Sequence, residues 1–340
     1  MNRRAAKRLR GSGAATRRGF IASAAALLAA PYVAAQAPPA KWPERVIKLV
    51  VPFTPGGSTD VLARVIAHVI EPKLGQPIVI ENRPGSGGVQ AATAVARSDP
   101  DGYTLMMGHI GTLAFNPWLY RSLAYDPRNA FAAIAQVAIV PNILAVHAAF
   151  PATTVGELIA LARGKPGTLT YGSGGNGSAA HIATAYLAHA AGLDLVHVPY
   201  RGTAPAVNDL AGGHINMMMT GGPALLPLVA SGKMRALAVS SAQRVPFAPE
   251  LPPLAEAAGL PGFEAVQWYG MVGPARLPDT IVQRLNGLVN EALASAEVAE
   301  TLLKDGALAM PGSSEAFATL IRNDIDTWGR IIVQAGIKTG

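Results

Sequence analysis

The 340-residue chain contains no cysteine, so it can form no disulfide, offers no thiolate nucleophile and carries no cysteine for a lipid anchor. Only 14% of its residues are charged, while 50% are hydrophobic. Such a composition excludes a disordered protein and predicts a large buried core. The length favours two domains.

A general excess of positive charge is also missing. The formal net charge is +7, but residues 1–37 alone carry seven basic residues and no acidic one. The other 21 basic residues equal the 21 acidic residues in number. Because binding to a phosphate backbone uses clustered excess cations, we expect no nucleic-acid partner.

The basic N-terminal segment has the layout of an export signal. An apolar run over 20–35 follows the basic stretch, and Ala35-Gln36-Ala37 forms a small-residue cleavage site. The pair Arg17-Arg18 indicates a twin-arginine signal, with an ordinary Sec signal as the alternative. We therefore expect residues 1–37 to be removed and the mature protein to be soluble and periplasmic.

One charge-free stretch, 129–156, is long enough to span a bilayer. Gln136, the pair Pro141-Asn142 and His147 interrupt it, and its Val and Ile residues cluster on either side of that break. Two consecutive buried strands are the better interpretation.

Short β-branched runs alternate with amphipathic segments of helix length after Pro43, which predicts an α/β fold with mainly parallel sheets flanked by helices. The pattern indicates that the chain passes from one domain to the other near Pro141 and returns within 241–262. We therefore expect a first domain from 43–140 plus 264–340 and a second from 141–263, with a ligand cleft between them.

Two glycine-rich loops join a strand to a helix. The first, 52–60, contains Thr54, Gly56, Gly57 and Ser58, and lets the backbone and free N–H groups of a helix start approach an anion. It lacks the Gly-Lys-Ser/Thr ending of a nucleotide-binding P-loop. A tight turn capped by Ser58 or Asp60 is the alternative interpretation.

The second loop, 171–178, satisfies a Gly-x-Gly-x-x-Gly spelling, but no acidic residue follows the next strand to hold a ribose. Tyr171 replaces the first glycine of a hydrolase elbow around Ser173. The seven histidines show no metal-binding spacing, so we expect no metal and no cofactor. We interpret this loop as a second helix N-terminus that faces a carboxylate, with His181 packing behind it.

The chain resembles the Bug-type substrate-binding proteins of tripartite tricarboxylate transporters. The matching segments follow one another through nearly the whole mature chain: Trp42-Pro43, 50–60, 81–88, 100–105, 125–127, 171–173 with Gly177, Ser178 and His181, 198–202, and 237–240.

This resemblance implies a periplasmic Venus-flytrap protein without catalytic activity, which binds a small organic carboxylate and serves two membrane subunits, itself as a monomer. It also implies that the two glycine loops face each other across the cleft. The implied ligand-binding residues are Thr54, Gly56, Gly57 and Ser58 on one wall and Ser173, Asn176, Gly177, Ser178, Tyr200 and Thr203 on the other. Where many relatives have an acidic residue, this chain has Thr220-Gly221-Gly222, which favours a plain carboxylate over an amino acid.

Two other functions remain open. An exported α/β enzyme acting on a carboxylate would need a paired acid and base or a metal cluster, and the sequence indicates neither. A sensor that reports its ligand to a signalling partner would have the same binding site, and the sequence does not separate it from a transport receptor.

Overall fold

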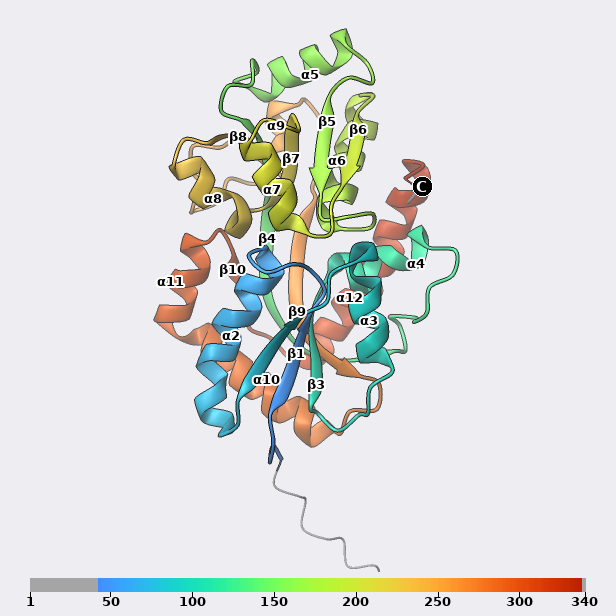
Figure 1. The fold of residues 1–340 in the computed structure, drawn as a ribbon, viewed down its shortest axis with the longest axis vertical. Helices are drawn as coiled ribbons and strands as arrows, with labels where there is room; N and C mark the ends of the chain where they lie inside the picture. Colours follow the sequence, from blue (N-terminus) through green and yellow to red (C-terminus); the bar gives the residue numbers. More distant parts are fainter. Residues whose placement is uncertain (1–41, 338–340) are drawn as a thin grey trace, which may run out of the picture. The chain divides into compact units, whose positions relative to one another are not determined.

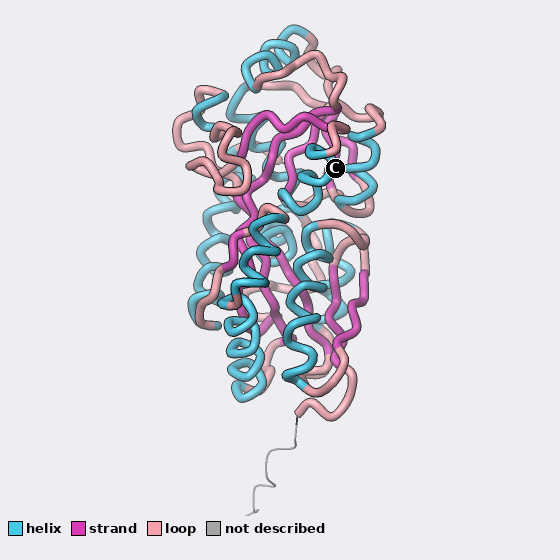
Figure 2. Tube along the Cα trace, turned by 90° about the vertical axis from the view of Figure 1, so that its left-hand side faces the viewer, coloured by secondary structure: helices cyan, strands magenta, loops and turns pink. Residues whose placement is uncertain are grey.

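The computed structural model describes residues 42–337, so the expected export signal lies outside the described residues. Strands and helices alternate along most of the chain (Figure 1). The expected α/β class is confirmed. Ten strands are connected through their ladders, and helices lie against both faces of this strand layer, as Figure 2 shows.

The first set of ladders, called sheet A below, holds the strands nearest the N-terminus. β1 pairs in parallel with β2 and β3, while β9 joins β3 in antiparallel orientation and continues to β4. The bounds are β1 Ile47–Val51, β2 Ile78–Asn82, β3 Thr104–His109, β4 Phe131–His147, β9 Val266–Pro274 and β10 Leu308–Ala309. The outer strands are parallel, as expected, and the antiparallel ladders of β4 and β9 were not indicated by the sequence.

The second set, called sheet B, is built on the far end of β4. β7 and β8 pair with β4 in antiparallel orientation, and β5 pairs in parallel with β7 and β6. The bounds are β5 Thr170–Ser173, β6 Val196–Pro199, β7 Met217–Gly221 and β8 Met234–Val239.

The prediction of two strands separated at Pro141 was wrong about the break, because β4 is a single strand of 17 residues. Residues 131–141 pair with β9, and residues 142–147 pair with β7 and β8. Pro141 therefore lies where the strand passes from one sheet to the other, a place where a missing N–H is tolerated. No helix within 42–337 is long and apolar enough to cross a membrane.

Helices connect many of the strands and cover the sheets. α2 spans Ser58–Leu74, and its buried face, with Leu62, Ile66 and Ile70, covers sheet A. α5 begins with a capping box formed by Thr154 and Glu157. The other helices are α3 Val89–Ala96, α4 Asn116–Leu119, α5 Val155–Gly164, α6 Ala179–Ala191, α7 Thr203–Ala211, α8 Gly222–Ala230, α9 Leu254–Ala257, α10 Asp279–Ala294, α11 Ala296–Lys304 and α12 Ser314–Gln334.

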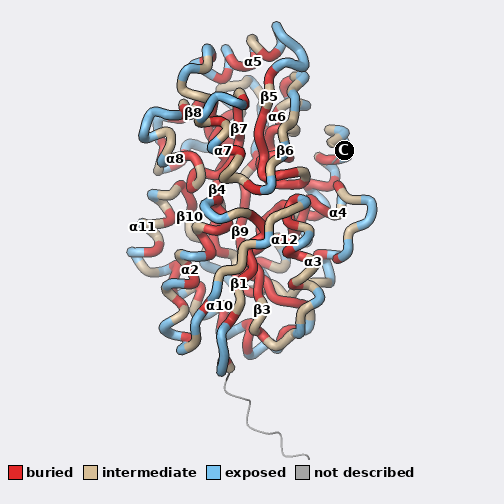
Figure 3. The backbone as a smooth tube through the Cα atoms, in the orientation of Figure 1, coloured by how far each residue is buried: buried red, intermediate tan, exposed pale blue. Residues whose placement is uncertain are grey.

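The hydrophobic core continues from one sheet to the other. A single cluster of buried side chains includes Val50 and Met106 of sheet A together with Leu144 and Met219 of sheet B. Figure 3 shows this buried interior running along the strands, with exposed segments at the helix ends and loops. The turn Gly111–Phe115 has π-helical geometry and leads directly into α4.

Candidate functional site

The first glycine loop is held in shape by Asp60. Its carboxylate accepts the Gly56 N–H at 3.0 Å, two hydrogen bonds from Arg64 at 2.9 and 3.0 Å, and one from Asn82 at 2.9 Å. Burial alone would raise the pKa of Asp60, but these hydrogen bonds outweigh it and lower the pKa below its ordinary value. Asp60 therefore supports the loop and is not free to bind a ligand.

The N-cap of α2 is Gly57, and no side chain caps the helix. Of the alternative interpretation, a turn capped by Ser58 or Asp60, the Ser58 part was therefore wrong, whereas Asp60 does hold the turn through the Gly56 N–H. The Asp60 N–H donates to the Gly57 carbonyl at 2.9 Å, so the N–H groups that the start of α2 offers are those of Ser58 and Thr59. Gly56 has a φ of 84°, which a residue with a side chain rarely adopts.

Side chains of the second loop and of the start of α6 accept hydrogen bonds from nearby backbone N–H groups, which the sequence did not indicate. The Ser178 hydroxyl is the N-cap of α6 and accepts the His181 N–H at 3.4 Å, while His181 Nδ1 accepts the Gly177 N–H at 3.2 Å. The Gly177 amide is thus already satisfied. The next amides, at the start of α6, remain the donors that an anion could use.

Two of the predicted binding residues have their hydroxyls engaged elsewhere. Ser173 is fully buried, and its Oγ lies 2.6 Å from His197 Nε2 and 3.1 Å from the Gly175 nitrogen. The Tyr200 hydroxyl donates to Asp209 at 2.5 Å. These contacts organise the loop from behind and leave neither hydroxyl facing the first loop.

The two sheets meet through glycine residues. A Cβ on Gly57 would lie 3.4 Å from Thr203 Cβ, and one on Gly202 would overlap Thr54 Oγ1. The predicted residues Thr54, Gly57 and Thr203 are therefore brought together, as predicted. A third loop, which the sequence analysis did not place in the site, also takes part: Gly87 touches the Asn176 carbonyl, which accepts the Tyr120 hydroxyl at 2.8 Å.

Four buried polar atoms within residues 43–337 have no hydrogen-bond partner: Thr54 Oγ1, Ser58 Oγ, His109 Nε2 and Asn116 Oδ1. The Tyr269 hydroxyl, which lies near Ser58, donates to Gln267 at 2.5 Å. An unpaired buried polar atom is costly, so these four atoms indicate a place for a polar ligand.

Each of these atoms lies beside a glycine at the contact of the two sheets. A Cβ built on the glycine would come within 3.0 Å of Ser58 Oγ at Gly221, within 2.6 Å of Asn116 Oδ1 at Gly177, and into Thr54 Oγ1 at Gly202. His109 reaches the same contact through Gly111, whose Cβ would lie 2.8 Å from the Gly177 carbonyl oxygen and would also overlap the His109 ring.

Sequence reasoning missed His109 and Asn116. His109 ends β3, which is parallel to β1, so its side chain leaves the same sheet edge as the first loop. Its position at the end of a strand expected to be parallel to β1 is the one sequence signal that could have identified His109. Asn116 follows the π-helical turn, which no sequence pattern indicated.

The site contains little charge. Asp60 is the only buried Asp, Glu, Lys or Arg among the described residues, and Arg64 occupies it. Burial lowers the pKa of His109 to about 3, so its imidazole is neutral at pH 7. An anion bound here would be held by neutral donors and helix N-termini.

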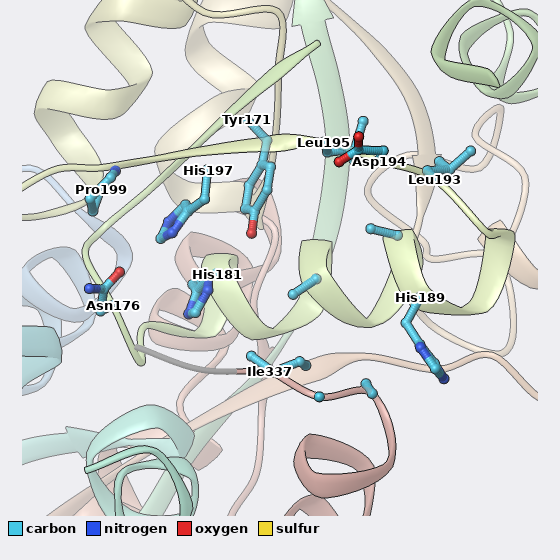
Figure 4. Close-up of a pocket in the computed structure, with 14 residues that line it drawn as sticks. Tyr171, Asn176, His181, His189, Leu193, Asp194, Leu195, His197, Pro199 and Ile337 are labelled. Carbon is cyan, nitrogen blue, oxygen red and sulfur yellow. The ribbon is translucent and has the colours of Figure 1, made fainter. Parts of the chain in front are cut away.

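A separate cavity of about 750 Å³ lies behind the second loop (Figure 4). His181 and His197 stack with ring centroids 4.1 Å apart, and Tyr171 stacks on His197 at 4.8 Å. Burial lowers the pKa of His181 to about 3 and that of His197 to about 4, so both rings are neutral at pH 7. The other side of the cavity is formed by His189, Asp194 and Ala335–Ile337, and no residue of the first loop lines it.

Nowhere in residues 42–337 do three potential metal ligands come together.

Comparison with known proteins identifies the family. Residues 62–337 match the model of the tripartite tricarboxylate transporter family receptor, TctC. The chain belongs to this receptor family. It is 35% identical to Protein BugT of Bordetella pertussis over 298 residues, which cover 87% of this chain and 91% of BugT. The resemblance to Bug-type proteins is thus confirmed.

Two solved structures share the fold closely. Rpa4515 of R. palustris, solved with adipate, is 39% identical with a TM-score of 0.85 and covers 87% of this chain and 98% of its own. MatC from Rhodopseudomonas palustris, solved with bound malate, is 34% identical with a TM-score of 0.82 and covers 86% of this chain and 100% of its own. These comparisons establish the receptor class and leave the individual site residues to be tested.

Proposed function

We propose that this chain binds a small organic carboxylate between the loop 54–58 of sheet A and the loop 174–178 of sheet B. The receptor would then deliver that carboxylate to the two membrane subunits of a tripartite tricarboxylate-type transporter. Adipate and malate, present in two structures of similar fold, are both dicarboxylates. Membership of the receptor family supports the transport role.

The observation that carries the proposal is the group of four unpaired polar atoms at the contact of the two sheets. Glycine lies so close to three of these atoms, Thr54 Oγ1, Ser58 Oγ and Asn116 Oδ1, that an added Cβ would come within 3.0 Å of each. A carboxylate supplies four acceptor positions and can satisfy the Thr54 and Ser58 hydroxyls and the His109 imidazole together, whereas Asn116 Oδ1 is an acceptor and needs a donor such as a ligand hydroxyl. Holding it without an arginine or lysine suits a receptor that must also release its ligand.

We further propose two domains, 43–140 with 264–340 and 141–263, that close on the ligand. β4 and β9 connect the two sheets, and the close approach of Gly57 to Thr203 and of Gly87 to Asn176 is the contact expected of a closed state. Binding split between two domains requires such closure to complete the site.

We infer a monomeric periplasmic receptor rather than an enzyme. An enzyme acting on a carboxylate would need an acid and base poised at the site, whereas His109 is held neutral by burial and Asp60 is bound to Arg64. A signalling receptor would share this site, so a transporter operon beside the gene would favour the transport role.

A thermal-shift screen tests the function. Purified mature protein is heated with each of a panel of di- and tricarboxylates and aromatic acids, against sodium chloride at equal ionic strength. A ligand at a hundredfold excess over its Kd should raise the Tm by roughly 5 °C, because it binds only the folded state. Turnover of a stabilising acid, monitored by chromatography, would support the enzyme instead. The same Tm with every acid contradicts the proposal.

A further inference from the structure

His109 is buried although one of its ring nitrogens has no hydrogen-bond partner, which is unexpected for a residue that only packs in the core. It is the last residue of β3, stands opposite Tyr269 of β9 and is only 2% exposed. The Phe53 ring covers it with centroids 4.7 Å apart, and the Tyr269 ring lies on it with centroids 5.8 Å apart. The imidazole thus packs against two aromatic rings, and its nitrogens are the atoms available for hydrogen bonds.

The hydrogen bond at one ring nitrogen determines the state of the other. The Gly111 N–H donates to His109 Nδ1 at 2.8 Å, so Nδ1 must be the acceptor. The neutral ring therefore carries its proton on Nε2, and Nε2 has no partner among the described residues. His109 presents a single buried N–H donor whose orientation is fixed by the backbone.

This ring edge lies at the contact between the two sheets. The space beside Gly111 is shared by His109 Cε1, which is bonded to Nε2, and by the Gly177 carbonyl of the second loop. Phe53, whose ring packs on the imidazole, belongs to the first loop. The His109 ring thus contacts the first loop and, beside Gly111, approaches the second loop, the two loops that the proposed carboxylate would bridge.

We propose that His109 Nε2–H donates a hydrogen bond to an oxygen of the ligand and thereby selects against an amino group at that position. This inference rests on the function proposed above and names a residue that determines specificity within that site. An ammonium group has only donors, so it would face the Nε2–H donor to donor. Reversing the imidazole tautomer would break the bond from Gly111 and leave two N–H groups opposed.

Two ligand pairs compare an acid with its amino counterpart. Malate and aspartate differ by a hydroxyl against an ammonium group, and adipate differs from 2-aminoadipate by one added ammonium group. Calorimetric titration of the wild type should give at least tenfold tighter binding of whichever hydroxy or plain acid is bound than of its amino counterpart.

Two variants test the residue itself. His109→Phe keeps a planar ring between Phe53 and Tyr269 but removes the donor, and should weaken binding of the plain acid tenfold or more. His109→Gln keeps an amide donor that can also turn its oxygen forward, so it should retain part of the affinity while discriminating less against the amino counterpart. Circular dichroism and the Tm establish that each variant is folded.

Nitrogen-15 NMR of the wild-type histidines gives a readout that needs no variant. The account predicts an Nε2–H signal for His109 that moves when the bound acid saturates the protein. If His109→Phe binds the acid with the same affinity as the wild type, or if the Nε2 signal does not move with ligand, this inference is overturned. The proposed function then still stands. Wild-type protein that binds none of the screened acids contradicts the proposed function and this inference with it.

Discussion

Gly87 and Asn176 touch so closely that a Cβ on Gly87 would overlap the Asn176 carbonyl oxygen. Gly87 follows β2 in sheet A, and Asn176 lies in the second glycine loop of sheet B. A substitution that disrupts this contact therefore tests whether the two sheets must approach each other for ligand to bind.

Gly87→Ala should weaken carboxylate binding by at least tenfold, because the methyl group holds the two loops apart. Part of any loss of stability comes from its φ of 59°, which disfavours alanine. Gly75→Ala is the matched control, since Gly75 has a φ of 72° and no atom within 4 Å of the added methyl. Calorimetry should find normal affinity in Gly75→Ala. Equal affinity in the two variants would mean that this contact is not needed for binding.

Ser178→Ala should weaken binding by about tenfold to a hundredfold if the Ser178 hydroxyl contacts the carboxylate. The same change removes the N-cap of α6 and should cost about 1 kcal/mol of stability. Ser313→Ala removes the corresponding cap of α12, where Ser313 Oγ accepts the Ala316 N–H at 3.1 Å, and should cost similar stability without affecting binding. Calorimetry and urea unfolding of both variants separate the roles. Wild-type affinity in Ser178→Ala would show that this hydroxyl only caps its helix.

Gly57→Val should weaken binding more than Ser178→Ala does and leave no measurable affinity. A Cβ at Gly57 already comes within 3.4 Å of Thr203 Cβ, and the two further methyl groups would occupy the space between α2 and α7. Small-angle scattering should show that saturating acid compacts the wild type but not this variant. Compaction of both would place the ligand away from the first loop.

The loops were predictable because glycine and serine between a strand and a helix leave a local signal in the sequence. Helix α2, Ser58–Leu74, begins directly after the glycines of the first loop, where that signal places a helix start. The fate of individual hydroxyls was not predictable. Ser173 turns to His197 and Tyr200 turns to Asp209, and these partnerships depend on how β5, β6 and α7 pack.

Two features of the fold escaped the sequence for a tertiary reason. Pro141 looks like a break in sequence, yet β4 continues through it because the strand changes ladder partners there. His109 looks like an ordinary strand histidine, and only the Gly111 N–H on Nδ1 reveals that its other nitrogen is an unpaired donor.

Stability should fall as the pH drops below about 6.5. Burial lowers the pKa of His109 and His181 to about 3 from an ordinary 6.5, so between these values the unfolded chain binds protons that the folded chain does not. The loss should be on the order of 2 kcal/mol for each of these two histidines between pH 6.5 and 5.

Urea unfolding at pH 7.5 and 5.0 measures this effect. His181→Phe keeps a ring in the stack with His197 and should reduce the loss, whereas His68→Gln, at an exposed position, should leave it unchanged. Equal free energies of unfolding at the two pH values contradict the assignment of neutral buried histidines.

The mature protein should begin at or close to Pro38, after the small-residue site Ala35-Gln36-Ala37. Intact-mass spectrometry of protein from the periplasmic fraction tests this export prediction. Replacing Arg17 and Arg18 by lysines should block twin-arginine export but leave Sec export largely intact. A periplasmic protein whose mass still includes Arg17 and Arg18 would contradict signal cleavage.

A crystal structure with the acid that most raises the Tm tests the central claim most directly. The account predicts a carboxylate at the contact of the two sheets, with oxygens within hydrogen-bond distance of the first turns of α2 and α6 and of His109 Nε2. The cavity lined by His181, His189 and Asp194 should contain no acid. Acid bound in that cavity, with the contact between Gly57 and Thr203 empty, would contradict the account.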